Sequence, residues 1–262
     1  MKSMRTKAVG ARKKVTERTW LFPLLLMLGV LKLAATTTVF AQVCTPPPPG
    51  MVSWYSGDGN AEDIAGSHDA FPRNGVTFAP GMVAQAFSFD GVNDFVEVPD
   101  SPDLAPSSLT VDAWVKPTSG EPRDGTIVAK YNSSIPNGVS WGLFMLSTGQ
   151  LRFLVDQNAR ERLVDTVNPV LPPGAWKHVA ATFDVATQAM AIYVDGVQVP
   201  SAFLPGYENT VTSITDSSTP VTIGTAIDSR WWIWMAAALT RYWSPGRKQL
   251  RRMRLRLTSR LA

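Results

Sequence analysis

The sequence predicts an all-β protein folded as an antiparallel β-sandwich or barrel. Short segments with an apolar residue at every second position recur along the chain, separated by turns rich in Gly, Pro and Asp. Residues 51–228 contain no long stretch with helical periodicity. Two polar, irregular segments, 57–75 and 201–218, are predicted to be surface loops, where binding residues usually lie.

The clearest local signal is a hairpin formed by segments 174–184 and 188–196. Apolar residues alternate along both segments, and the second one ends at the turn-forming pair Asp195-Gly196. The other predicted strands are Met51–Tyr55, Val76–Phe78, Gln85–Phe89, Asp94–Val98, Leu109–Lys116, Thr126–Tyr131, Ser140–Leu146, Gln150–Asp156, Arg162–Val167 and Val221–Ala226.

Charges are segregated along the chain. Residues 1–41 hold eight basic side chains and residues 230–262 hold nine, out of 25 Lys and Arg. The segment 42–229 therefore keeps eight basic residues against 20 of the 21 acidic ones, which gives it a formal charge of −12. A segment with this much negative charge argues against nucleic acid as a partner and is typical of a cation-binding or extracellular protein.

The N-terminal residues 1–41 have the layout of a signal peptide. Basic residues precede an apolar run that begins at Trp20, and small residues before Gln42 offer a cleavage site. Lys32 limits that run to about a dozen residues, whereas a membrane-spanning helix needs about 20, so an uncleaved anchor is the weaker alternative. We expect a protein that is secreted or displayed at the cell surface, with no membrane span after cleavage.

A short leader, residues 42–50, follows the predicted cleavage site. Its Cys44 is the only cysteine of the chain and has no partner for an internal disulfide. Its four consecutive prolines predict a stiff, extended spacer. The folded domain is therefore expected to span 51–228, with an atypical tail at 229–262.

Four segments in a fixed order carry a family resemblance. They are Gly50–Gly66 with its Asp63-Ile-Ala-Gly66 turn, Ala86–Val98 with Asp90-Gly-Val-Asn-Asp94, Leu109–Pro117, and Trp176–Val197 with Tyr193-Val-Asp-Gly-Val197. Segment 51–228 resembles the laminin-G-like jelly-roll domains of bacterial secreted proteins, within the concanavalin A-like lectin and glucanase superfamily. The resemblance implies a two-sheet jelly-roll β-sandwich, generally non-catalytic, that binds glycans or proteins outside the cell, often with calcium.

The tail, residues 229–262, departs from the family pattern. Family members end with a strand that carries an acidic-hydrophobic motif, whereas this tail holds four of the nine tryptophans, nine basic residues and no acid. A shifted reading frame is the favoured interpretation, and a basic tail for anionic polymers or membrane surfaces is the rival. We expect the tail to pack poorly and to leave a sheet edge unpaired, with at most one short strand at Met253–Leu257.

Calcium is the sharpest candidate ligand. Asp58, Asn60 and Asp63 fall in one predicted loop, and carboxylate and amide oxygens are the ligands that calcium prefers. The spacing is not that of an EF-hand, and turn capping by these side chains is the alternative. A second acidic turn, Asp90–Asp94, contains a hairpin-forming Asp-Gly pair, which favours a structural role.

Sugar binding requires exposed aromatic rings near polar groups, and Trp114, Trp141 and Tyr207 are the candidates. Trp54 and Trp176 occupy family core positions and are expected to pack inside.

Catalysis is not expected. Glucanases of this fold carry a Glu-x-Asp-x-x-Glu run on one strand, and this sequence has none. Neither His68 nor His178 has a Ser or Cys partner in a recognisable motif. The prediction is a non-catalytic module, carbohydrate-binding or adhesive and assisted by calcium. The alternative that stays open is a structural or protein-interaction domain without a small ligand.

Overall fold

The computed structural model describes residues 49–118, 124–224, 236–237 and 255–259, all within one compact unit. The predicted signal segment and most of the leader lie outside these residues. The described residues form strands and turns with one short 3-10 helix, η1 (Pro102–Leu104). None of their helices is long and apolar enough to cross a membrane.

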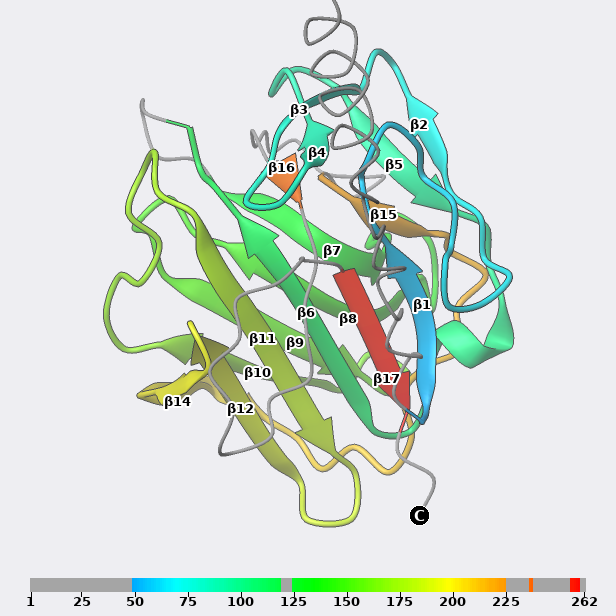
Figure 1. The fold of residues 1–262 in the computed structure, drawn as a ribbon. Coiled ribbons are helices and arrows are strands. Elements are labelled where there is room, and N and C mark those ends of the chain that lie inside the picture. The colour runs from blue at the N-terminus through cyan, green and yellow to red at the C-terminus, as the bar shows by residue number, and fades with distance from the viewer. Residues whose placement is uncertain (1–48, 119–123, 225–235, 238–254, 260–262) are drawn as a thin grey trace, which may run out of the picture. The chain divides into compact units, whose positions relative to one another are not determined.

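Two antiparallel sheets pack face to face, with sheet A in front of sheet B in Figure 1. In spatial order, sheet A contains β1 (Met51–Tyr55), β17 (Leu255–Ser259), β6 (Leu109–Val115), β11 (Lys177–Asp184), β12 (Ala189–Val194) and β13 (Val197–Val199). Sheet B contains β14 (Ser201–Glu208), β10 (Glu161–Thr166), β9 (Leu151–Asp156), β8 (Val139–Met145), β7 (Gly125–Tyr131), β15 (Val221–Ile223), β5 (Phe95–Val98) and β2 (Phe71–Arg73). A third, small sheet contains β16 (Ala236–Ala237), β4 (Gln85–Ser88) and β3 (Thr77–Pro80). The all-β antiparallel sandwich is confirmed.

The core lies between the sheets because alternate residues of each strand point inward. Val111 of β6 and Val179 of β11 face Leu143 of β8 and Phe153 of β9 across one cluster, and all four are fully buried. Trp54 points the other way. It belongs to a second, smaller cluster on the outer face of sheet A.

The predicted hairpin is confirmed as β11 and β12. Asp195 and Gly196 have φ of 51° and 81° and link Val194 to Val197. Positive φ at both central residues is the conformation that Asp-Gly turns favour in two-residue hairpins.

Two predicted loops contain strands. Within 57–75, Phe71–Arg73 pairs with β5, and within 201–218 the edge strand Ser201–Glu208 pairs with β10. The ladder between β10 and β14 has an irregular register, and Pro205 and Gly206 fall inside β14. These features hide the period-two signal, because proline and glycine are rare in strands except at edges and bulges.

The tail was expected to form at most one short strand, at Met253–Leu257, and to leave a sheet edge unpaired. A short strand is present two residues further along, and there it is paired on both sides. Leu255–Ser259 forms β17 between β1 and β6, with Leu257 opposite both Ser53 and Val111. The pair Ala236–Ala237 adds β16 to β4. The other tail residues, and the question of the reading frame, lie outside the described part of the chain.

Candidate functional site

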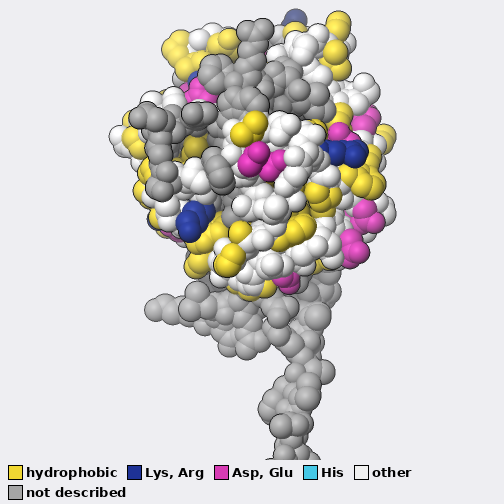
Figure 2. Space-filling model, turned by 90° about the horizontal axis from the view of Figure 1, so that it is seen from above, with side chains coloured by type: hydrophobic (Ala, Val, Ile, Leu, Met, Phe, Trp, Pro, Cys, Tyr) yellow, Lys and Arg dark blue, Asp and Glu magenta, His cyan; other side chains and the backbone are white. Residues whose placement is uncertain are grey.

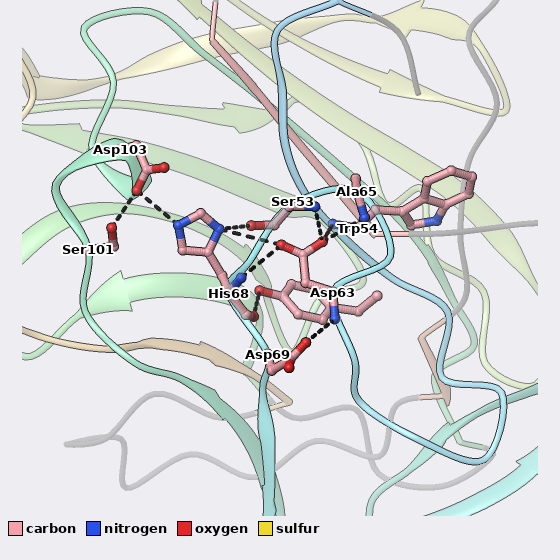
Figure 3. A network of polar contacts seen from close by, with 10 residues as sticks. Ser53, Trp54, Asp63, Ala65, His68, Asp69, Ser101 and Asp103 are labelled. Carbon is pink, nitrogen blue, oxygen red and sulfur yellow. Dashed lines mark hydrogen bonds and ion pairs between the residues drawn. The ribbon is translucent and has the colours of Figure 1, made fainter. Parts of the chain in front are cut away.

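The Asp63 carboxylate is the centre of a hydrogen-bond network that joins β1 to the loop after it (Figure 3). Its Oδ1 atom accepts bonds from the backbone N–H groups of Trp54 (2.8 Å), Ala65 (3.0 Å) and Gly66 (3.0 Å). Its Oδ2 atom accepts a fourth backbone bond, from His68 (3.1 Å). This carboxylate therefore fixes the loop to the sheet.

The residues predicted to bind calcium do not fit a calcium site. Both oxygens of Asp63 already accept protein donors, and three of these bonds converge on Oδ1. The Asn60 amide oxygen accepts the backbone N–H of Glu62, and Asp58 is exposed. No group of three or more His, Cys, Asp or Glu with metal-binding geometry occurs among the described residues. A calcium ion would have to displace the bonds that hold the loop.

The structure also brings together a Ser, a His and an Asp that the sequence did not connect. His68 lies 3.0 Å from Ser53 Oγ through Nδ1 and 3.0 Å from Asp103 Oδ1 through Nε2. Ser53 is 1% exposed, and Oδ1 of Asp63 occupies the nearby backbone donors that an oxyanion would need. The trio can brace the loop but cannot present a nucleophile to a substrate.

Electrostatics support this structural role. Burial raises the pKa of the Tyr55 phenol above its usual range, so the hydroxyl remains a donor to the His68 carbonyl at 2.7 Å. Burial opposes ionisation of Asp103, but the hydrogen bond from Ser101 and the neighbouring His68 outweigh it and lower the pKa of that carboxyl.

Of the three aromatic residues predicted to bind sugar at the surface, Trp141 does not reach the surface. It is fully buried in the main core, and its Nε1 donates to the Leu104 carbonyl at 2.7 Å. Trp114 lies on the outer face of sheet A, where it packs against the cluster of Trp54 and contacts the ring of His178. His178 Nε2 in turn lies 3.1 Å from Asp112 Oδ2.

Tyr207 is 38% exposed and lies on β14, at the edge of sheet B. Its phenol is close enough to Arg152 to affect the pKa of that guanidinium. Tyr207 is therefore an exposed aromatic at the edge of sheet B, near Arg152.

This outer face carries an aromatic platform that sequence reasoning missed. A Cβ added to Gly142 would lie 2.3 Å from Cζ and 2.4 Å from Cε2 of Phe144, so the edge of the Phe144 ring occupies the space that a side chain at 142 would need. Tyr131 meets the ring edge-on, with centroids 5.6 Å apart. The platform requires a glycine at 142, and a glycine two positions before an aromatic residue on one strand is the only sequence signal of it.

Charged groups surround the platform. Phe144 lies opposite Arg152 on β9, and Arg152 makes two 2.8 Å hydrogen bonds to both oxygens of Asp165 on β10. The bonds to Asp165 raise the pKa of Arg152. Burial raises the pKa of Glu161, and the nearby Asp156 adds to the effect.

The floor of this face is apolar. Leu154 and Leu163 pair across β9 and β10, point away from the core, and are each only 4% exposed. An aromatic ring, an apolar floor and a fixed ion pair are the elements from which proteins build sites for hydroxyl-rich ligands.

The family model of the concanavalin A-like lectin/glucanases superfamily, of laminin-G type, matches residues 90–233, more than half of the chain. The chain belongs to this superfamily. The match covers β5 to β15 and therefore most of sheet B, including the platform. No curated protein matches the sequence.

Several solved structures share the fold of this superfamily member. The receptor-binding domain of botulinum neurotoxin mosaic serotype C/D aligns with TM-score 0.53 and 14% identity, covering 81% of this chain and 48% of that one. Trypanosoma rangeli sialidase aligns with TM-score 0.54 and 20% identity, covering 93% and 38%. The sialidase in complex with sialic acid gives TM-score 0.52 and 19% identity, covering 91% and 37%. The chain spans less than half the length of each, and at these identities the likeness concerns the fold alone.

Proposed function

We propose that this protein is an exported, non-catalytic module that binds neutral glycans through the outer face of sheet B. The observation that carries the proposal is the Phe144 ring, packed against Gly142 beside the Arg152–Asp165 pair. A flat ring stacks on the apolar face of a sugar, and a fixed guanidinium and carboxylate hydrogen-bond its hydroxyl groups. Export rests on the signal-like N-terminus.

The charge of this face favours neutral over anionic sugars. Asp156, Glu161 and Asp165 outnumber Arg152, and Arg152 is already paired with Asp165. Figure 2 shows a different surface, the end of the molecule seen from above, where a few acidic and basic groups lie scattered among apolar and uncharged side chains. One neighbour in fold was solved with sialic acid, but the acidic groups here would repel such a carboxylate.

The absence of catalysis rests on how the acidic groups are held. Asp156 is 1% exposed and bonds to Thr215 and the Ala159 backbone, so it is poorly placed to meet a glycosidic bond. Ser53, the candidate nucleophile beside His68, is equally inaccessible.

Binding to a panel of neutral and sialylated glycans tests the proposal. The wild type should bind neutral members, and Phe144→Ala should weaken binding at least about tenfold, the equivalent of about 1.4 kcal/mol. Gly142→Ala should also weaken it, since the new Cβ would displace the ring without removing it. Phe71→Ala, at an exposed aromatic of β2 in the same sheet, is the matched control and should bind normally.

Two results would contradict the proposal. If Trp114→Ala loses glycan affinity and Phe144→Ala does not, the binding site lies on the outer face of sheet A. Failure of the folded wild type to bind any glycan would favour the alternative of a structural or protein-interaction domain.

A further inference from the structure

The outer face of sheet B is charged unevenly along its strands. At one end Arg152 and Asp165 neutralise each other through two hydrogen bonds of 2.8 Å. At the other end, where β9 ends and β10 begins, two carboxylates oppose each other directly, those of Asp156 and Glu161. The row between these ends is the apolar floor described above. The face therefore has a neutral end and an acidic end.

The two carboxylates of the acidic end have no basic partner within the described part of the chain. None of the Lys, Arg or His side chains there forms an ion pair with Asp156 or Glu161. Arg160, the residue before Glu161, is exposed and pairs with neither of them. Arg162, the residue after it, donates to three backbone carbonyls instead. The two negative charges are therefore uncompensated.

Burial makes this charge costly. Asp156 is 1% exposed, and its Oδ2 accepts the Thr215 hydroxyl at 3.0 Å and the Ala159 N–H at 3.1 Å. Its Oδ1 is buried and has no hydrogen-bond partner among the described residues. Burial raises the pKa of Asp156 and of the half-buried Glu161, and the charge of Asp156 raises the pKa of Glu161 further. A positive charge beside Glu161 would relieve both carboxylates.

The aromatic platform reaches toward this acidic end. The edge of the Phe144 ring lies over Gly142, which pairs with Leu154 of β9, and Asp156 is two residues further along β9 in the same direction. Glu161 lies two strands across and two residues along from Gly142, about 12 Å away at strand spacings of about 4.8 Å and about 3.3 Å per residue. A glycan that stacks on the ring and also contacts Glu161 therefore needs more than one sugar residue.

We propose that the acidic end of this face selects glycans that carry a free, protonated amino group, such as oligomers of glucosamine. Glu161 forms the ion pair with the ammonium group, and the buried Asp156 adds its negative charge from the neighbouring strand. An N-acetylated sugar can stack on Phe144 equally well, but it has no charge for Glu161 to pair with. The inference rests on the glycan-binding function proposed above and extends it from neutral sugars to those with an amine.

Calorimetric titration of the full-length protein with glucosamine and N-acetylglucosamine oligomers of equal length is the test. At about pH 6 the amine is protonated, since ordinary amino groups titrate above about pH 7. The glucosamine oligomer should bind at least about fivefold more tightly, because a charged hydrogen bond is stronger than a neutral one. This preference should shrink between about 50 and 500 mM NaCl, because salt screens charge pairs.

The two proposals fail in different ways. Equal affinity for the two oligomers, or no binding of either one by the folded protein, overturns the selection of amines. Glycan binding itself is overturned only if the wider panel of glycans is negative as well.

Substitutions locate the selection. Glu161→Gln keeps the size of a half-buried side chain and removes its charge, so the ratio of the two affinities should fall below about twofold. Phe144→Ala should weaken both oligomers together. Glu62→Gln, which removes the same charge from an exposed loop residue outside this face, is the matched control and should keep the preference. A preference that persists in Glu161→Gln, or disappears in Glu62→Gln, would refute the role of Glu161.

Discussion

Replacing Asp63 with alanine should destabilise the fold strongly, whether or not calcium is present. Alanine removes a carboxylate that accepts four backbone N–H groups and lies 3.4 Å from Nδ1 of His68. The loop 63–68 would lose four of its attachments at once. The backbone bond from Ile64 N–H to the Trp54 carbonyl and the contacts of His68 with Ser53 and Tyr55 would remain.

The size of the effect follows from the burial of the donors. The Trp54 bond is buried and the other three are partly buried. An unpaired buried donor costs about 1–3 kcal/mol, and partly buried donors recover some of this from water. We expect a loss of about 3–5 kcal/mol, which corresponds to a fall in the unfolding midpoint of about 6–20 °C for a domain of this size.

Urea and thermal unfolding, followed by circular dichroism with and without CaCl2, measure this loss. Asp63→Asn should retain part of the stability, since the amide oxygen can still accept some of the donors. Asp58→Ala, an exposed acid of the same region, should change stability by less than about 0.5 kcal/mol. A loss below about 1 kcal/mol in Asp63→Ala would refute the bracing role. A loss seen only with calcium present would restore the metal-binding interpretation of Asp63.

Two further outcomes follow from other buried charges. Lys130 is fully buried and donates to Asp100 and, at 2.8 Å, to the Thr219 carbonyl. Asp100→Asn leaves the buried ammonium without its counter-charge and should lower the free energy of unfolding in urea by about 3–5 kcal/mol. Lys130→Met leaves only a partly exposed carboxylate unpaired and should lower it by about 1–3 kcal/mol. The reverse order would contradict this reasoning. The pKa of Asp103 is lower in the folded protein than its ordinary value of 3.8. The ionised carboxylate therefore stabilises the fold above pH 3.8, and this stabilisation is lost as the pH falls through the pKa of the folded state. The wild type should therefore exceed Asp103→Asn in stability at pH 6, with the difference shrinking below about pH 4, and a constant difference in pH-dependent unfolding would exclude this linkage.

The sequence alone was sufficient for the fold class and for most strands. Period-two alternation is a local property, because successive side chains of a strand point to opposite faces whatever the strand packs against. The β11–β12 hairpin was therefore predictable, as was the Asp195-Gly196 turn that follows β12. Strand β14 was not, since Pro205 and Gly206 interrupt the alternation in an edge strand.

The site required the tertiary structure. For Trp141 the period-two pattern was already informative, because Trp141 shares one face of β8 with Val139, Leu143 and Met145, whereas Phe144 shares the other face with Ser140 and Gly142. What the pattern does not show is that the Phe144 ring packs against Gly142 beside the Arg152–Asp165 pair of two other strands, because these contacts depend on how the strands pair.

The acidic turns show the same limit. The sequence placed Asp58, Asn60 and Asp63 close together along the chain, but closeness along the chain does not determine which oxygens remain free. Backbone donors from β1 and its loop use the oxygens of Asp63, while one oxygen of Asp94 is buried and has no hydrogen-bond partner among the described residues. Contacts between segments distant in sequence decide which carboxylate oxygens accept hydrogen bonds and which stay free. The local sequence pattern does not show these contacts.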